Sequence, residues 1–555
     1  MTKQRVYRFF PAAVALLTLL AFLPALGNDW LNWDDDKNFL NNPNWGGLGW
    51  TQLKWMWTSH LMGRYIPVTW MTLGLDHIIW DLDPFGYHLT GILLHAANAV
   101  LFYFVAIALF SIAIPESANE KRANIPLAAL FAALVFGLHP LRAESVAWVT
   151  ERRDLVSGMF YLLAILAYLR AFHGAASPRI ERRGYLACFV FFILAVLSKE
   201  ITVTLPLLLL LLDVYPLRRL GPAAGGWFSR KSRHVWVEKT PFFVVSLASS
   251  ALSLYVGRLE NLTSSLTQES LLQRIAASTY GLAFYLWKTV APFHLSPLYA
   301  LTSHRADLKA LPFQLSAMVV LGLGSIAVIV RRRWPALPIV CLAYIIALIP
   351  VLGIFQNGYQ ITADRYSYLA CLGWAILAGG VLLTGSRAWP KGGQQTLGLA
   401  AALVVGGLGY LTWKQVQIWK DSETLWTKAI AVEPSFIACN NLGLIFSDRH
   451  EYKRAVEEYR MALRMNPEFE LAHNNLGAAL LELAEWEAAA VEFETALKLK
   501  PALASAHFGL GYARMKQGRM DDAIAQFQTA LSLNPGWERA RDFLTQALAM
   551  KASGP

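Results

Sequence analysis

Long apolar stretches separated by short polar connections fill the first three quarters of the chain. Measured against the roughly 20 residues that a helix needs to cross a bilayer, they predict about eleven membrane spans. The predicted spans are residues 7–27, 86–112, 124–139, 155–170, 185–198, 201–216, 241–257, 312–330, 336–353, 366–384 and 395–413. Residues 271–290 are also long enough to cross, but we interpret them as a re-entrant or surface-lying helix. Counting them as a span would move the arginine triplet at 331–333 to the opposite side of the membrane.

The last quarter of the chain has a different pattern, a repeat with a period of 34 residues. The repeated columns hold a Leu-Gly pair, an alanine, an aromatic residue and a second alanine. They are Leu442-Gly443, Leu476-Gly477 and Leu510-Gly511, then Ala455, Ala489 and Ala523, then Tyr459, Phe493 and Phe527, then Ala462, Ala496 and Ala530. Pro467, Pro501 and Pro535 close the units, because proline cannot continue a helix. The period and the residue classes resemble tetratricopeptide repeats, which are stacked pairs of helices.

These two patterns predict an all-α fold in two domains. Residues 1–413 would form a membrane helical bundle, and residues 414–555 a tetratricopeptide-repeat α-solenoid. We expect the solenoid to contain a half-repeat at 419–433, three full repeats at about 435–535 and a capping helix at 536–550. A membrane enzyme or transporter has no chemical need of such an array, so a second polypeptide is an expected partner.

Composition supports a membrane protein and narrows the remaining classes. Of 555 residues, 55% are hydrophobic and 16% charged, and the mean hydropathy of +0.38 is too high for a soluble chain of this length. The net charge of +11 would suit nucleic acid, but beyond Trp413 there are 16 Lys and Arg against 18 Asp and Glu. The excess therefore lies in the membrane domain, where it reports topology, and no nucleic-acid partner is expected. The four cysteines lack metal-ligand spacing and predict neither a disulfide nor a zinc site.

Basic residues gather in the connections that would share one side of the membrane. They are Lys3, Arg5, Arg8, Lys121, Arg122, Arg179, Arg182, Arg183, the region 218–239, the triplet 331–333, Arg387 and Lys391. Cytoplasmic loops carry the excess of Lys and Arg, so this distribution predicts a multi-pass protein of the cell inner membrane with a cytoplasmic N-terminus. The repeats would then lie on the non-cytoplasmic, periplasmic side. Acidic residues fall in the opposite connections, so we expect any chemistry on the outer face.

The first outer connection contains three consecutive aspartates, Asp34, Asp35 and Asp36. Adjacent carboxylates repel one another, so one of them can have a raised pKa and act as a base, or the three can coordinate a divalent cation. The alternative is a solvated acidic turn. Eight tryptophans lie between Trp30 and Trp80, which indicates a loop held at the membrane interface and favours a function for the carboxylates.

Three further outer turns hold ionisable residues close to predicted spans. His139, Glu144, Arg152 and Asp154 lie between the third and fourth spans, Lys199 and Glu200 in a very short turn, and Asp364 and Arg365 at the start of a late span. Ionisable groups at such depth are functional candidates by default. The alternatives are interface anchors and helix caps for the first group and a mutual ion pair for Lys199 and Glu200.

Five segments occur in a characteristic order before the repeats: WDDDKNFLNNP, GRYIPVTW, HPLRAESVAWVTERRDL, SKEITVTLP and ADRYSYL. In these segments and their order the chain resembles the transmembrane and tetratricopeptide repeat-containing O-mannosyltransferases and their bacterial relatives. The resemblance implies a GT-C glycosyltransferase that uses a polyprenyl-phosphate sugar donor on the non-cytoplasmic face. Asp34 and Asp35 match the paired acidic motif of the family, and Asp36 is an additional carboxylate. Two departures concern Arg64, which is separated from the proline that follows it in the family, and Asp364, where the family has glutamate.

The expected reaction assigns roles to these residues. A lipid-phosphate leaving group needs cations at the membrane surface, and Lys199, Arg365, Arg64 and Arg152 are available. The acceptor hydroxyl needs a base, for which Asp34 or Asp35 is expected, and direct displacement would invert the anomeric centre. The predicted donor site is completed by the remaining ionisable residues of the outer turns, Glu200, Asp364, Asp154, His139 and Glu144.

The acceptor is expected to bind the repeats. Asn441 and Asn475 stand one residue before their Leu-Gly pairs, as in an asparagine ladder that grips peptide backbone, although Gly509 breaks the ladder in the third unit. A docking or stabilising module is the alternative for the repeats. Two other classes stay open for the whole chain: a glycan ligase or polymerase with a lipid-linked glycan acceptor, and a non-catalytic membrane-anchored scaffold.

Overall fold

The computed structural model describes residues 7–114, 124–173, 178–259, 270–300, 309–353, 360–388 and 391–553. Almost all regular structure in these residues is helical, which confirms the all-α prediction; the two short strands are β1 (Tyr299–Ala300) and β2 (Gln360–Thr362). The chain divides into two compact units. The first comprises Met1–Leu295 and His304–Asp421, and the second comprises Ser296–Ser303 and Ser422–Pro555.

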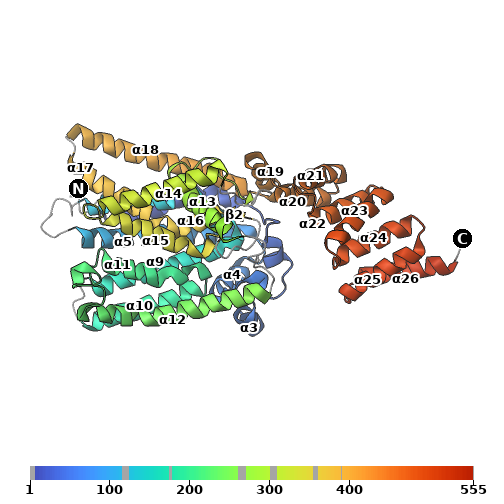
Figure 1. The fold of residues 1–555 in the computed structure, drawn as a ribbon, viewed down its shortest axis with the longest axis horizontal. Helices are drawn as coiled ribbons and strands as arrows, with labels where there is room; N and C mark the ends of the chain where they lie inside the picture. The colour runs from blue at the N-terminus through green and yellow to red at the C-terminus, as the bar shows by residue number, and fades with distance from the viewer. Residues whose placement is uncertain are drawn as a thin grey trace. The chain divides into compact units, whose positions relative to one another are not determined.

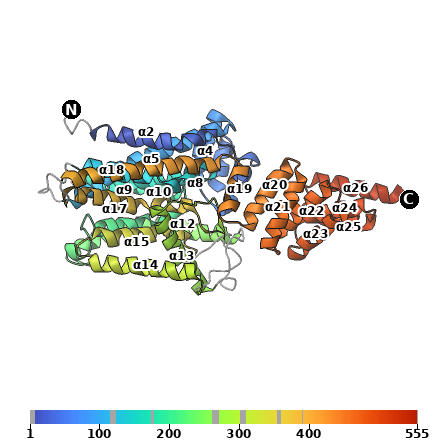
Figure 2. The same cartoon turned by 90° about the horizontal axis from the view of Figure 1, so that it is seen from above.

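The long helices of the first unit run side by side (Figures 1 and 2). They are α2 (Phe10–Phe22), α4 (Pro67–Trp80), α5 (Pro84–Ala113), α7 (Ile125–Gly137), α9 (Arg152–Phe172), α10 (Pro178–Val196), α11 (Leu205–Val214), α12 (Arg230–Leu259), α13 (Leu271–Val290), α14 (Leu311–Val330), α15 (Ala336–Leu348), α17 (Leu372–Ala388) and α18 (Lys391–Val416). Short elements connect them: α3 (Trp50–Thr58), α8 (Ala143–Ala147), α16 (Ser367–Ala370) and the single turns η1 (Leu23–Gly27), η2 (Asp36–Leu40), η3 (Leu61–Gly63), η4 (Pro140–Arg142), η5 (Val149–Glu151), η6 (Glu200–Thr204), η7 (Pro222–Ala224), η8 (Ile349–Val351), η9 (Asp364–Tyr366) and η10 (Gln417–Trp419).

Within the described residues, six helices are long and apolar enough to cross a membrane, and two bent pairs raise the number to eight. The six are Phe10–Gly27, Pro84–Ala113, Val149–Phe172, Ser232–Leu259, Leu311–Val330 and Gly393–Trp419. This is fewer than the predicted number, because α10, α11 and α15 do not meet the same criterion; α11 has only 10 residues. Helix α13, which covers the ambiguous residues 271–290, is not among the candidate spans either.

Two bends between consecutive helices place charged residues inside the first unit. The axis bends by 54° between α7 and the segment Pro140–Ala147, and by 56° between Asp364–Ala370 and α17. The first break is explained by Pro140, which lacks the N–H that would continue the helical ladder. As a result, Glu144 and Arg365 lie at helix termini, where their side chains can turn toward one another.

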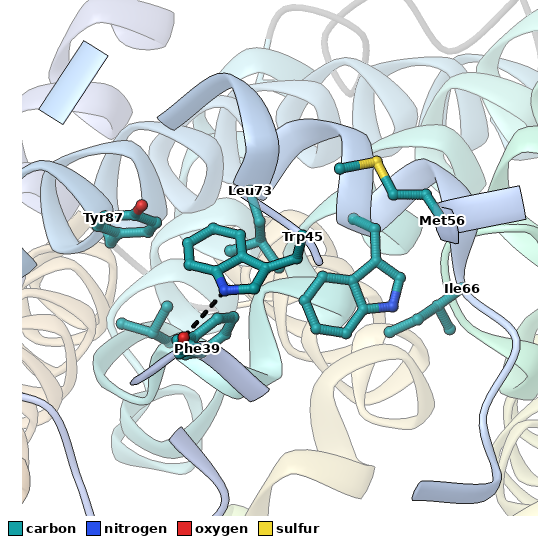
Figure 3. Close-up of a cluster of buried hydrophobic side chains, with 8 residues drawn as sticks. Phe39, Trp45, Met56, Ile66, Leu73 and Tyr87 are labelled. Carbon is teal, nitrogen blue, oxygen red and sulfur yellow. Dashed lines mark hydrogen bonds between the residues drawn. The ribbon is translucent and has the colours of Figure 1, made fainter. Parts of the chain in front are cut away.

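The tryptophan-rich segment between α2 and α5 contributes to a small cluster of buried hydrophobic side chains (Figure 3). Trp45 is buried against Phe39, Trp70 and Tyr87, and its indole N–H donates to the carbonyl of Phe39 at 3.0 Å. Met56, Ile66, Leu73 and Val149 complete the cluster. Phe39 belongs to the turn η2 that follows the aspartates, so this core fixes one end of the acidic segment.

The second unit is the predicted solenoid. Its helices are α19 (Ser422–Val432), α20 (Phe436–Asp448), α21 (Tyr452–Met465), α22 (Glu470–Glu482), α23 (Trp486–Leu499), α24 (Ala504–Lys516), α25 (Met520–Leu533) and α26 (Glu538–Ser553). The Leu-Gly column has a packing reason, since a Cβ on Gly443 would lie 2.6 Å from the Tyr459 ring and one on Gly511 would lie 2.8 Å from Phe527. A Cβ on Gly509 would lie 2.2 Å from Phe493, which explains why glycine interrupts the asparagine ladder.

Candidate active site

The centre of the site is Glu151, a carboxylate that the sequence reasoning missed. Its side chain is 0% exposed and contacts three cations. Its oxygens lie 2.9 Å from Nε of Arg153, 3.0 Å from Nζ of Lys199 and 3.2 Å from Nε of Arg365. Glu151 is the last residue of η5, the turn that leads into α9. Lys199 and Arg365, which come from two other elements, therefore lie at the start of α9. The run Glu-Arg-Arg-Asp at the start of an apolar helix was the only sequence signal.

Two further carboxylates complete a buried ion network. Asp154 accepts from Lys199 Nζ at 2.6 Å and from the Ser145 hydroxyl at 3.1 Å. Glu144 accepts from the backbone N–H of Arg365 at 2.8 Å and also pairs with its guanidinium. Three carboxylates thus balance three cations away from water. Buried charges are costly unless each is paired and hydrogen-bonded, and here each one is.

Most of the predicted donor-site cations are therefore already engaged. Lys199 and Arg365 belong to the network, whereas Arg152 forms a separate buried pair with Asp76 at 2.7 Å and donates to the carbonyl of Tyr87 at 2.5 Å. Glu144, Asp154, Lys199 and Arg365, all predicted, come together. Arg152 does not join them, because its side chain points to α4 and α5.

Arg64 is the predicted cation that differs from the others. Its side chain is half-buried and forms no ion pair with a described residue. Burial, and then repulsion from Arg153, lower the pKa of Arg64, while Glu151, Glu200 and Asp34 attract its charge. One oxygen of Glu200 is buried and has no hydrogen-bond partner among the described residues. Arg64 follows two left-handed residues, Met62 (φ 54°) and Gly63 (φ 74°), which set the direction of the chain at this point.

Hydrogen bonds to Asp35 connect the acidic segment to the ion network around Glu151. It is 1% exposed, and it accepts from the Thr150 hydroxyl at 2.6 Å, the Thr150 N–H at 3.2 Å and the Leu31 N–H at 3.1 Å. The Asn38 amide donates to the same hydroxyl at 3.1 Å. Thr150 immediately precedes Glu151, so the buried carboxylate ties the loop to the centre of the site.

Asp34 has a different environment from its neighbour. It is half-buried, its backbone is left-handed with φ 73°, and its charge interacts with that of Arg64. Such a φ is uncommon for a residue other than glycine. Asp36 has one buried oxygen that receives no hydrogen bond from the part of the chain that the structure describes. Among the described residues, no group of three or more His, Cys, Asp or Glu side chains could hold a metal ion, so the three aspartates do not converge on one point.

The buried state of Asp35 predicts a pH-dependent stability. Burial raises the pKa of Asp35 from 3.8 to about 7, against the opposing effect of its hydrogen bonds. A carboxyl whose pKa is higher in the folded state stabilises that state fully below the unfolded pKa and loses this contribution as pH rises through 7. We expect the unfolding midpoint in detergent to fall more between pH 5 and pH 8 for the wild type than for Asp35→Asn. Asp36→Asn is the matched control, and parallel pH profiles for wild type and Asp35→Asn would contradict the assignment.

His139 and Asp364 occupy structural positions near the site. His139 precedes η4; its Nδ1 accepts from the Leu141 N–H at 3.3 Å and its Nε2 lies 3.0 Å from the carbonyl of Thr289. Both ring nitrogens are engaged in holding the helix break to α13. Asp364 is buried at the first position of η9, and its carbonyl accepts from the Ser367 hydroxyl at 2.6 Å.

The predicted acceptor residues lie in the second unit. The Asn475 amide donates to the Asn440 side chain at 3.0 Å and accepts from Asn474 at 3.2 Å, while Asn441 accepts from Asn440 at 3.4 Å. Asn440 and Asn474 were missed, although they share the 34-residue spacing. These hydrogen-bonded asparagines connect α20 to α22.

The fold and these sites define a polytopic helical membrane protein with a C-terminal tetratricopeptide solenoid. Two family models match the solenoid: "Tetratricopeptide repeat" over residues 474–536 and "TPR repeat" over residues 443–483. The crystal structure of MamA is 24% identical and covers 23% of this chain and 77% of its own, with a TM-score of 0.23.

Curated relatives extend the similarity into the membrane unit. Protein O-mannosyl-transferase Tmtc3 of Drosophila melanogaster is 24% identical over 466 residues, which cover 74% of this chain and 49% of that protein. Protein O-mannosyl-transferase F38B6.6 of Caenorhabditis elegans is 24% identical over 474 residues, 82% of this chain and 62% of that protein. The chain thus spans about half to three fifths of the length of these relatives. The resemblance predicted from the motifs is confirmed, and the chain is a relative of the transmembrane and tetratricopeptide repeat-containing O-mannosyltransferases.

Proposed function

We propose that this protein is a GT-C membrane glycosyltransferase that moves a sugar from a polyprenyl-phosphate donor to a hydroxyl of a protein acceptor, with inversion. The observation that carries the proposal is the hydrogen bond from the Thr150 hydroxyl to Asp35. It brings the acidic loop next to the buried ion network around Glu151. One location then holds a carboxylate that can take a proton and cations that can stabilise a phosphate. The names of the relatives support this reaction class and favour mannose as the sugar.

We assign different roles to the two paired aspartates, on the basis of their burial and hydrogen bonds. Asp35 is buried and accepts hydrogen bonds on both carboxylate oxygens, so it holds the loop in place. Asp34 is half-buried and is the better base. In the proposed step the acceptor oxygen bonds to the anomeric carbon while the bond from that carbon to the phosphate oxygen breaks. The hydroxyl proton passes to Asp34, and the electron pair leaves with the lipid phosphate. Arg64 faces the negative charge that develops there.

Removing the guanidinium of Arg64 is expected to weaken donor use. A charge-assisted hydrogen bond is worth about 1.5–3 kcal/mol, so Arg64→Ala should lower donor turnover roughly ten- to a hundredfold. Arg64→Lys should recover part of this loss. Lys199→Ala and Arg365→Ala should also lower turnover, but they break buried ion pairs and should lower the unfolding midpoint as well. Unchanged turnover in Arg64→Ala would move the phosphate site to Lys199 and Arg365.

The proposed reaction requires the site and the repeats to face away from the cytoplasm. We therefore expect a reporter enzyme fused after residue 413 to be active on the periplasmic side of the inner membrane, since the arginine clusters assign the other loops to the cytoplasm. A second fusion within residues 218–239 is the matched control and should report a cytoplasmic location. Cytoplasmic activity of the first fusion would mean that α13 crosses the membrane.

The acceptor class is tested in cells. Mass spectrometry of envelope proteins from cells with and without the gene should show hexose on serine or threonine only when the gene is present. If proteins were unchanged and a lipid-linked glycan were altered, the reaction would be that of a glycan ligase or polymerase. Loss of neither product would favour a membrane-anchored scaffold.

A further inference from the structure

Three tryptophans from distant parts of the first unit, Trp33, Trp148 and Trp419, form one cluster of near-parallel rings in which each ring packs against the other two, referred to below as the stack. The ring centroids of Trp33 and Trp148 lie 5.0 Å apart with an angle of 28° between planes. Trp419 lies 6.3 Å from Trp33 and 5.9 Å from Trp148, with angles of 7° and 23°. Trp148 and Trp419 are 2% and 1% exposed, and Trp33 is half-buried. These distances and near-parallel planes are those of offset aromatic stacking.

The three rings come from three different segments of the first unit, two of which contain residues of the candidate site. Trp33 directly precedes Asp34. Trp148 precedes η5, which ends at Glu151, and the guanidinium carbon of Arg365 lies 5.5 Å from its ring centroid. Trp419 ends the last candidate span. The stack therefore joins the acidic loop, the ion network and the end of that span.

The stack explains how Asp34 keeps its unusual backbone conformation. Asp34 has φ 73°, and such a conformation persists in a residue with a side chain only when the surroundings enforce it. On one side Trp33 packs against both of the other rings. On the other side Asp35 accepts a hydrogen bond from the Thr150 hydroxyl. The N–H of Asp29 also donates to the carbonyl of Lys420 at 2.8 Å, which ties the loop to the chain next to Trp419.

The hydrogen bonding of the indole N–H groups shows which substitution separates the ring face from the N–H donor. Neither Trp148 nor Trp419 has a hydrogen-bond partner for its buried N–H within the described part of the chain. A buried donor without a partner is unfavourable, so these side chains contribute through their ring faces. Phenylalanine at position 419 would keep a ring face and remove the unpaired donor.

We propose that Trp419 is a positioning residue for transfer, acting through Trp33 to hold Asp34 toward the acceptor hydroxyl. The inference rests on the proposed function. Because a misplacement of about 1 Å can cost about a hundredfold in rate, Trp419→Ala should lower the kcat of transfer roughly ten- to a hundredfold with little change in the KM for donor. Trp419→Phe should restore kcat to within about threefold of the wild type.

The test is a steady-state transfer assay on the purified full-length protein, using polyprenyl-phosphate mannose and a serine- and threonine-containing peptide. Trp413→Ala is the matched control, because Trp413 lies in the same candidate span, is 42% exposed and stands outside the stack. If Trp419→Ala does not fold, Trp33→Leu replaces it and should show the same loss of kcat, with Trp33→Phe restoring it.

Two results would overturn the inference. One is a kcat within threefold of the wild type in Trp419→Ala, or in Trp33→Leu where that variant replaces it. The other is an equal loss of kcat in Trp413→Ala, or in Trp419→Phe. An inactive wild type is a separate outcome, because it would remove the proposed function itself.

Discussion

Replacing Asp34 with asparagine is expected to lower transfer by about 10²–10⁴-fold, the usual contribution of a general base. Asparagine has nearly the same volume as aspartate, so the loop keeps its packing while the proton acceptor is lost. Asp34 is half-buried and its carboxylate is not needed to hold the loop, since Asp35 makes the bonds to Thr150. We therefore expect unchanged donor affinity and an unchanged unfolding midpoint, measured on the same purified preparation as transfer.

The neighbouring aspartates supply matched controls for this experiment. Asp36→Asn should have a mild effect on transfer. Asp35→Asn should reduce transfer as well, but together with a changed pH dependence of stability, because its carboxylate is buried and accepts three hydrogen bonds. Full transfer by Asp34→Asn and by the double variant with Asp35 would make the acidic segment a structural turn. The base would then have to be sought at Glu144 or Asp154.

Glu151→Gln is expected to lower the free energy of unfolding by about 3–5 kcal/mol, because removing one partner of a buried charge cluster leaves the others uncompensated. Arg153, Lys199 and Arg365 all contact this carboxylate. Glutamine keeps the shape and two of the possible hydrogen bonds but removes the charge. The effect is measured by chemical unfolding in detergent micelles.

The matched control for that variant is Glu181→Gln, an exposed glutamate on α10, which should change the free energy of unfolding by less than about 0.5 kcal/mol. Equal, small changes in the two variants would show that the cations around Glu151 are stabilised by water or by other groups. The three carboxylates and three cations would then not depend on one another for their stability.

The solenoid could be predicted from the sequence because its contacts are local. Gly443 meets Tyr459 within one helix pair, and the same relation recurs with the period of the repeat. The spans were less certain, since hydropathy alone does not show where a helix ends. Helix α11 ends after 10 residues, and the helix in the predicted span at 124–139 ends at Gly137, where the chain bends.

The site could be predicted only in part, because its contacts join segments far apart in sequence. Glu144 and Arg365 were recognised as separate candidates, although they form one ion pair across 221 positions. Glu151 was missed, since its role depends on Lys199 and Arg365 folding onto it. The different roles of the paired aspartates depend on Thr150, which lies 115 positions away from Asp35.

We propose that this chain itself transfers a sugar from a lipid phosphate to a protein hydroxyl. The most direct measurement incubates the purified protein, in liposomes, with polyprenyl-phosphate mannose and a serine- and threonine-containing peptide, and analyses the peptide by mass spectrometry and by the configuration of its anomeric carbon. The expected product carries one added hexose on a hydroxyl, with inverted configuration relative to the donor, and no product is expected with Asp34→Asn. An unmodified peptide with wild-type protein that is folded and binds the donor, or equal product from Asp34→Asn, would contradict it.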